Sequence, residues 1–365
     1  MNRKGVVYET GRIVDGRSWR PEFAPVETRR ELAIIRDDLH CNAVKITGDD
    51  IGRVTAVAAD ALEQGLEAWL APDVWDQDAD ATLDYIAEAA RSAGELHRQW
   101  QGRVVLIVAS ELTFFLRGIV EGSTVIERAK NPALMDRIRS GALNASVNDF
   151  LSQASRAARP VFEGSITYGS LFFEPVDWTL FDFAGVQLYR DAATPRRRDA
   201  AMAPMMDGVL RRLRGHNRPV IITEFGCCTY QGAADDGAMG WEVMEYHGRA
   251  KPPTLKGGYQ RDETGQADEL TSLLTLFDSA GTDGTFVNTF ISPLNACNDD
   301  PRFDFDMASY SLVKSYGNRL GDVATDYPDV PWDTTPAGTT YPDMPWEPKK
   351  AFWAVAGYYA THASA

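Results

Sequence analysis

The sequence predicts an α/β protein and, within that class, a single-domain TIM barrel, the (β/α)8 fold. Eight short apolar runs alternate with helical or partly helical stretches along the 365 residues, a pattern typical of a parallel sheet covered by helices. No GxGxxG motif opens an expected helix and no GxxxxGK[ST] is present, so the sequence lacks the main motifs of nucleotide-binding α/β proteins. Eight strand and helix units favour a closed barrel over an open sheet.

Strands are expected wherever a short apolar run occurs. The clearest is Val-Val-Leu-Ile-Val-Ala-Ser at residues 104–110, which is long enough for a buried strand and too short for a helix. In chain order the eight expected strands are residues 5–10, 41–47, 66–71, 104–110, 165–168, 183–189, 219–224 and 285–290.

Helices are expected where apolar residues recur at helical spacing or where alanine is abundant. Residues 27–39 show the spacing, and residues 54–64 are alanine-rich and end at Gly65. A long connection, 114–131, follows the fourth strand, and such loops often carry the sites of barrel enzymes. The expected helices are 27–39, 54–64, 81–100, 133–158, 200–215, 260–279 and 349–362, with one or two turns at 174–178.

Composition limits the class of function. The chain is 44% hydrophobic and 24% charged, which suits one globular domain, with the Pro-, Asp- and Trp-rich residues 322–348 as an irregular segment before a C-terminal helix. A formal net charge of -15 opposes nucleic acid and anionic membranes as partners. No apolar stretch nears the roughly 20 residues that cross a bilayer, and the N-terminus lacks a signal-peptide core. The expected location is cytoplasmic, and the oligomeric state is left open.

Cysteine, histidine and aspartate patterns give little support to a bound metal. The four cysteines form no CxxC pair and are expected to be reduced packing thiols, and none of the five histidines ends an expected strand. The aspartates at 299, 300, 304 and 306 suggest Ca²⁺, but the EF-hand glycine and terminal glutamate are missing, so a solvated loop or a substrate contact is favoured. Neither a metal nor a cofactor is predicted.

Carboxylates, amides and aromatic residues gather at the ends of the expected strands. Glu111 and Glu224 each end an apolar run, where a charge is costly to desolvate, and strand ends of a barrel converge on one face. Such residue types suit a small sugar or an oligosaccharide, because amides and carboxylates bind hydroxyls and aromatic faces cover C–H groups. The expected substrate-binding residues are Glu9, Lys45, Asp73, Trp75, Tyr168, Gln187, Tyr189, Asn288 and Phe290.

The placement of the two glutamates resembles the large clan of retaining glycoside hydrolases built on (β/α)8 barrels. Residues 223–226, Thr-Glu-Phe-Gly, are similar to the nucleophile strand of many members, and Tyr189 matches a tyrosine that ends the sixth strand. The clan usually has Asn before the acid/base and often Pro after it, where this chain has Ser110 and Leu112. It often has Trp at the end of the eighth strand, at the place of Phe290.

The resemblance implies a role for each glutamate. Glu224 becomes the nucleophile and Glu111 the acid/base of a glycoside hydrolase with a double-displacement mechanism, in which the two carboxyls lie about 5 Å apart. The missing Asn normally holds the sugar 2-hydroxyl, and Ser110, Asn288 or Gln187 are the candidates to replace it.

Other interpretations stay open at this level. The chain could be a non-catalytic barrel that binds a carbohydrate or a protein, and one of the glutamates could be the buried ion-pair partner of Lys45 or Arg190. Glu9 could equally form a salt bridge or a helix cap. Asp73 could cap the next helix instead of binding a sugar.

Overall fold

Eight parallel strands close into a barrel in the computed structural model, which describes residues 1–14, 17–190, 202–247, 251–317, 330, 332, 333, 335 and 337–362. Around the barrel the strand order is β1-β12-β9-β8-β7-β6-β5-β4. This confirms the predicted (β/α)8 fold. The barrel strands are β1 Arg3–Glu9, β4 Ala43–Gly48, β5 Glu67–Pro72, β6 Val104–Ser110, β7 Ser165–Leu171, β8 Ala184–Gln187, β9 Val220–Phe225 and β12 Gly284–Val287.

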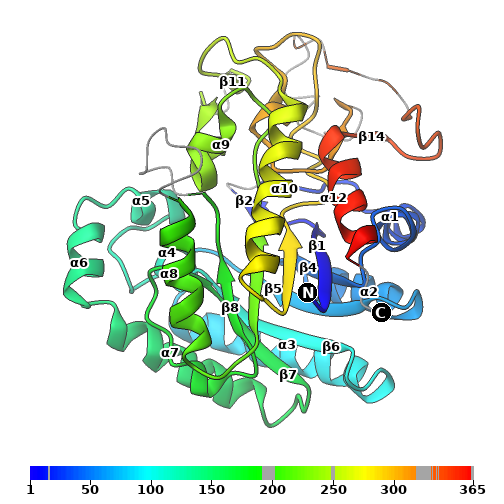
Figure 1. Ribbon diagram of the computed structural model, residues 1–365. Helices are drawn as coiled ribbons and strands as arrows, with labels where there is room; N and C mark the ends of the chain where they lie inside the picture. Colours follow the sequence, from blue (N-terminus) through cyan, green and yellow to red (C-terminus); the bar gives the residue numbers. More distant parts are fainter. Residues whose placement is uncertain are drawn as a thin grey trace.

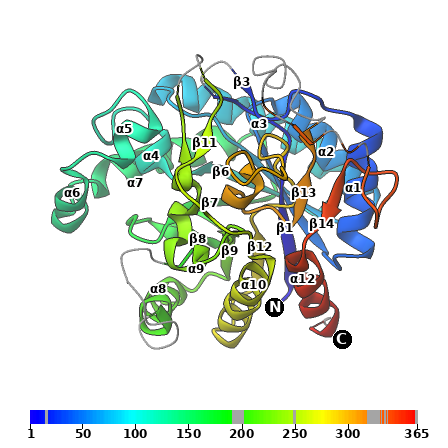
Figure 2. The same cartoon turned by 90° about the horizontal axis from the view of Figure 1, so that it is seen from above.

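Helices surround the barrel, as the view from above in Figure 2 shows. Those that cover its outer face are α1 Pro25–Asp37, α2 Ile51–Glu63, α3 Ala79–Gln99, α7 Asn144–Ala158, α8 Met202–Arg214, α10 Glu263–Ser279 and α12 Lys350–Thr361. Shorter ones lie in the loops: α4 Leu112–Phe115, α5 Val125–Ala129, α6 Leu134–Ser140, α9 Ala233–Asp236, η1 Trp178–Leu180, η2 Gly237–Val243 and η3 Phe305–Ala308.

Small two-stranded sheets lie in the loops beyond the strand ends, and β11 and β14 are seen at the top of Figure 1. They pair β2 Ile13–Val14 with β3 Arg17–Ser18, β10 Met244–Glu245 with β11 Thr254–Leu255, and β13 Val313–Ser315 with β14 Trp346–Pro348. Among the described residues, no helix is both long and apolar enough to span a bilayer.

The barrel interior is filled by side chains that point inward from alternate strand positions. Trp69 lies at its centre, with ring centroids 5.2 Å from Phe183 and 5.0 Å from Phe286. These rings fill the middle of the barrel, while Glu111 and Glu224 lie at the C-terminal ends of their strands. The interior cluster consists of Val7, Ala43, Trp69, Ala71, Val105, Ile107, Phe183, Ile221 and Phe286.

Besides shifts of strand and helix ends, several segments differ from the sequence prediction in the elements they form. Residues 133–158 form two helices, because Gly141 takes φ 71° and ends α6. The connection 114–131 holds α5 and the last residues of α4. Within the predicted irregular segment, residues 322–329 lie outside the described residues, and 346–348 form strand β14.

Candidate active site

Glu224 lies on β9, and its two carboxylate oxygens are bound by Lys45 of β4 and by Tyr189, which follows β8. The Lys45 Nζ is 3.1 Å from Oε2, and the Tyr189 hydroxyl donates to Oε1 at 2.6 Å. Asn288 Nδ2 donates to the same hydroxyl at 2.8 Å, which orients the Tyr189 O–H toward Glu224. The Lys45 side chain is 3% exposed and that of Glu224 is 21% exposed. A cation and an O–H donor thus bind the two carboxylate oxygens of Glu224.

Glu111 follows directly after β6 and has different surroundings. Its backbone is left-handed, with φ 43° and ψ 48°, and its carbonyl accepts from the N–H groups of Phe114 and Phe115. The pKa of the Glu111 carboxyl is raised well above its usual range, first by burial and then by the negative charge of Glu224. Lys45 opposes this rise only in part. The two glutamates thus have different surroundings, and the charge of Glu224 is one cause of the raised pKa of Glu111.

Ser110 and Gln187 come together beside this pair because Gly169 has no side chain. A Cβ at Gly169 would lie 2.8 Å from Ser110 Oγ and 3.4 Å from Gln187 Nε2. Gln187 is 4% exposed, and its Oε1 has no hydrogen-bond partner among the described residues. A buried amide oxygen left without a donor costs about 1–3 kcal/mol, and a sugar hydroxyl would supply one.

Glu9 and Asp73 are both bound to Arg12, a residue that the sequence analysis did not select. Arg12 is 7% exposed, and its guanidinium donates at 2.9 Å to Glu9 Oε2 and at 2.9 Å to Asp73 Oδ2. The salt-bridge alternative for Glu9 therefore holds. Asp73 does not cap a helix, since Asp78 caps α3. The signal for Arg12 was its place three residues after a strand-end glutamate.

Trp75 belongs to an aromatic cluster beside the same guanidinium. The Arg12 guanidinium carbon lies 4.4 Å from the Trp75 ring centroid, and Trp19 meets that ring edge-on at 5.4 Å. Phe115 stacks on it at 4.8 Å. Asp73 Oδ2 also accepts from Trp75 Nε1 at 3.0 Å. The predicted subsite residues Asp73 and Trp75 are thus brought together, partly exposed, on the Glu111 side of the barrel.

Phe290 and Tyr168 do not face the site, which corrects the sequence prediction. Phe290 is fully buried and packs between Tyr8 and Trp346, because the chain has already left β12 at Val287. Tyr168 is fully buried too. The fifth barrel strand runs on to Leu171, so Tyr168 lies in mid-strand with its ring toward the outer core.

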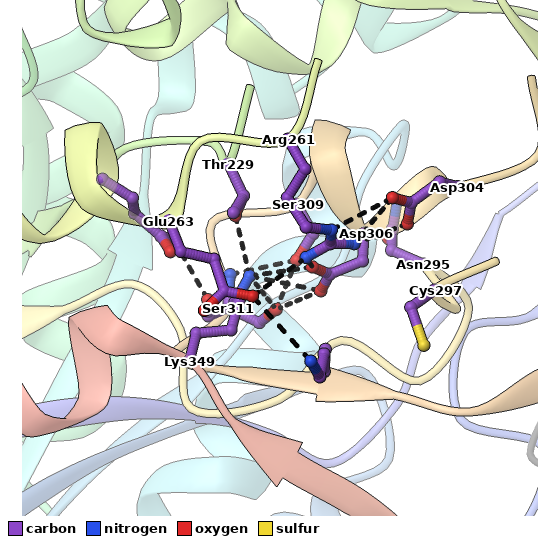
Figure 3. A network of polar contacts seen from close by, with 12 residues as sticks. Thr229, Arg261, Glu263, Asn295, Cys297, Asp304, Asp306, Ser309, Ser311 and Lys349 are labelled. Atoms are coloured by element: carbon purple, nitrogen blue, oxygen red, sulfur yellow. Dashed lines mark hydrogen bonds and ion pairs between the residues drawn. The ribbon is translucent and has the colours of Figure 1, made fainter. Parts of the chain in front are cut away.

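The aspartates considered for Ca²⁺ or substrate lie in a buried ion network (Figure 3). Asp306 is fully buried and Asp304 is 5% exposed. Arg261 binds both, with its Nη2 2.6 Å from Asp304 Oδ1 and its Nη1 2.7 Å from Asp306 Oδ2. Lys349 Nζ is 3.2 Å from both Asp306 oxygens. For Asp304 and Asp306 the expectation of a solvated loop or a substrate contact was therefore wrong, whereas Asp299 is exposed and Asp300 pairs with the exposed Arg302.

Comparison with known proteins gives matches only among solved structures. No family model and no curated protein matches the chain. A complex of a GH113 β-1,4-mannanase has 11% identity and a TM-score of 0.56, with 99% of each chain covered. A GH5-4 broad-specificity endoglucanase from Clostridium longisporum has 11% identity and a TM-score of 0.54, with 98% of this chain and 96% of the other covered. The likeness shows the fold.

Other similar structures are of the same kind. The apo structure of β-glucosidase 1317 has 10% identity and a TM-score of 0.52, with 100% of this chain and 99% of the other covered. The barrel is therefore shared with glycoside hydrolases at identities too low to carry residue roles across.

Proposed function

We propose that the protein is a retaining glycoside hydrolase that cleaves β-linked or equivalent glycosidic bonds by double displacement. Glu224 is the nucleophile and Glu111 the acid/base. The observation that carries the proposal is the unequal surroundings of the two carboxyls. Lys45 and Tyr189 donate hydrogen bonds to the two oxygens of Glu224, whereas burial and nearby negative charge raise the pKa of Glu111. A retaining enzyme needs a carboxylate nucleophile and a protonated acid, and we assign these two states to Glu224 and Glu111.

Each step of the reaction uses one of these states. A Glu224 oxygen attacks the anomeric carbon, the bond to the leaving oxygen breaks, and that oxygen takes the proton of Glu111. Glu111, now a carboxylate, then takes a proton from water, whose oxygen attacks the same carbon and releases Glu224. The buried amide of Gln187 and the Tyr189–Asn288 pair supply polar groups for the sugar hydroxyls.

The similar solved structures support the choice of substrate class. Among them are a β-1,4-mannanase and a broad-specificity endoglucanase. A panel of aryl β-glycosides and β-linked oligosaccharides is therefore the first set of substrates to try.

The test compares wild type with Glu111→Gln and Glu224→Gln. We expect kcat/KM to fall by about 10²–10⁴-fold in each variant, and Glu163→Gln, an exposed glutamate, to keep wild-type activity. NMR of the first sugar released should show the anomeric configuration of the substrate. Unchanged activity in Glu224→Gln would contradict the nucleophile role, and an inverted first product would contradict retention.

A non-catalytic carbohydrate- or protein-binding barrel is the second candidate. The specific observation in its favour is that Lys45 and Tyr189 occupy both oxygens of Glu224, as an ion pair with a purely structural role would. Under this reading, wild type binds an oligosaccharide in calorimetry but turns over none of the panel, and Glu224→Gln binds with equal affinity.

A further inference from the structure

We propose that Glu174 and Tyr168 are positioning residues that hold Glu111 in place and leave its carboxyl available for catalysis. The inference rests on the proposed function of Glu111 as acid/base. It begins with a property of α4, whose N-cap is Glu111. The first N–H groups of a helix have no partner within the helix, and an N-cap side chain usually accepts from one of them. Glu111 makes no such hydrogen bond.

Residues from β7 and the loop after it accept these hydrogen bonds instead. The Leu112 N–H donates to the Tyr168 hydroxyl at 2.8 Å, and the Thr113 N–H donates to Glu174 Oε1 at 2.9 Å. The Thr113 hydroxyl donates to the same oxygen at 2.7 Å. The two residues after Glu111 are thus fixed from outside the helix. The Glu111 carboxyl is therefore not needed for capping.

Glu174 accepts hydrogen bonds through both of its carboxyl oxygens. Its Oε2 accepts from the Tyr168 hydroxyl at 2.7 Å and from the Leu171 N–H at 2.8 Å. Together with the two donors of Thr113, four donors surround one carboxylate that is 5% exposed. Burial raises the pKa of Glu174 above its usual value, and these donors offset that rise only in part. Four donors on its two oxygens hold the carboxyl group in one orientation.

This anchoring is needed because the backbone of Glu111 is strained. A residue with a Cβ in the left-handed region costs about 1–2 kcal/mol, and Glu111 has φ 43°. Such a conformation persists only where the surroundings hold it, as at many catalytic sites. Here the Glu111 N–H donates to the Gly169 carbonyl at 2.9 Å, while Tyr168 and Glu174 hold the next two residues.

Glu174 also acts on Glu111 through its charge. The groups that face Glu111 are Glu224, Glu174 and Asp73, whose charges raise its pKa beyond the effect of burial, and Lys45, which lowers it. The same residue therefore sets both the geometry of the proposed acid and its readiness to keep a proton.

The leaving group of the substrate separates positioning of the acid from general damage. The 2,4-dinitrophenolate group of a dinitrophenyl glycoside leaves without being protonated, whereas the phenolate of a phenyl glycoside of the same sugar needs a proton from the acid. In Tyr168→Phe we expect kcat/KM to fall about 10–100-fold for the phenyl glycoside and less than about 3-fold for the dinitrophenyl one. Tyr8→Phe is the matched control, because the Tyr8 hydroxyl also donates to a buried carboxylate, Glu31, outside the site. It should change neither value.

Titration of Glu111 gives a readout that does not depend on activity. In ¹³C-glutamate-labelled protein, the signal missing from Glu111→Gln identifies this carboxyl, and Glu174→Gln should lower its pKa because one negative charge is removed. Equal losses on both glycosides, or an unchanged pKa of Glu111 in Glu174→Gln, would overturn the inference. If wild type cleaves no glycoside, the proposed function fails while the titration still decides the role of Glu174. If Glu174→Gln does not fold, the ratio of kcat/KM on the two glycosides in Tyr168→Phe tests the inference.

Discussion

At the scale of single residues, the site shows how neighbours give one residue type two chemistries. The Glu224 carboxylate binds the Lys45 ammonium and the Tyr189 hydroxyl. The Glu111 carboxyl is buried and lies near the negative charge of Glu224. We propose that this difference in surroundings divides the roles of nucleophile and acid between the two glutamates.

The pH profile of kcat/KM should report the charges around Glu111. Its pKa is raised, so the protonated acid persists to higher pH than for an ordinary glutamate, and activity is lost as pH rises through that pKa. Asp73→Asn removes a negative charge and should move this alkaline limb to lower pH. Lys45→Met removes a positive charge and should move it to higher pH, with a lower maximum because Glu224 loses its partner. Limbs that move in the same direction in both variants would contradict the assignment.

The residues visible from the sequence are those whose place follows from a strand end. Residues that lie in or directly after an apolar run are brought together when the barrel closes, as for Glu111, Glu224, Gln187 and Lys45. Arg12 and Glu174 lie in loops, where the partner of a charge depends on the three-dimensional path of the chain. Those loops bring together residues up to 61 positions apart, as for Arg12 with Asp73 and Thr113 with Glu174.

At the scale of elements, boundaries were predictable where the chain carries its own stop signal. The end of helix α2 was predicted from Gly65, which takes φ 94°, whereas its start at Ile51, after the N-cap Asp50, lies three residues before the predicted start at 54. The break at Gly141 was missed because the amphipathic pattern on either side is compatible with one helix, and only the turn geometry divides it. A pairing such as β13 with β14, between segments distant in sequence, leaves no local signal.

Two glycine substitutions test the reading of that break. Gly141→Ala should lower the free energy of unfolding by about 1–2 kcal/mol, because alanine is strained at φ 71°. Gly208→Ala, inside α8 with nothing within 4 Å of the added Cβ, should raise it by about 0.5–1 kcal/mol. Urea denaturation measures both values. A stabilised Gly141→Ala would mean that 134–158 can form one continuous helix.

At the scale of the whole molecule, the last helix, α12, binds the first strand of the barrel. The Tyr359 hydroxyl on α12 donates to the Gly5 carbonyl on β1 at 3.0 Å, and the Tyr359 carbonyl accepts from Lys4 Nζ at 3.0 Å. Trp346, just before the helix, donates to the buried carboxylate of Glu31 on α1 at 2.9 Å. The chain therefore closes on itself outside the barrel as well as within it.

Lys349, directly before α12, is where this closure depends most on one side chain. Its fully buried ammonium binds Thr229 Oγ1 at 2.8 Å and Asp306 at 3.2 Å. Lys349→Met should lower the free energy of unfolding by about 3–5 kcal/mol, because Asp306 loses one of its two cations. The adjacent Lys350→Met, which is exposed, should stay close to wild type in the same urea titration.

A second substitution distinguishes a lost ion pair from lost packing. In Lys349→Met/Asp306→Leu the carboxylate that lost a cation is gone and Arg261 still holds Asp304, so the double variant should be more stable than Lys349→Met alone. If the double variant is less stable, the network contributes mainly through packing around η3. If Lys349→Met itself unfolds like wild type, the C-terminal helix is held by its apolar face and by Tyr359 instead, and the buried ions of Figure 3 only compensate one another.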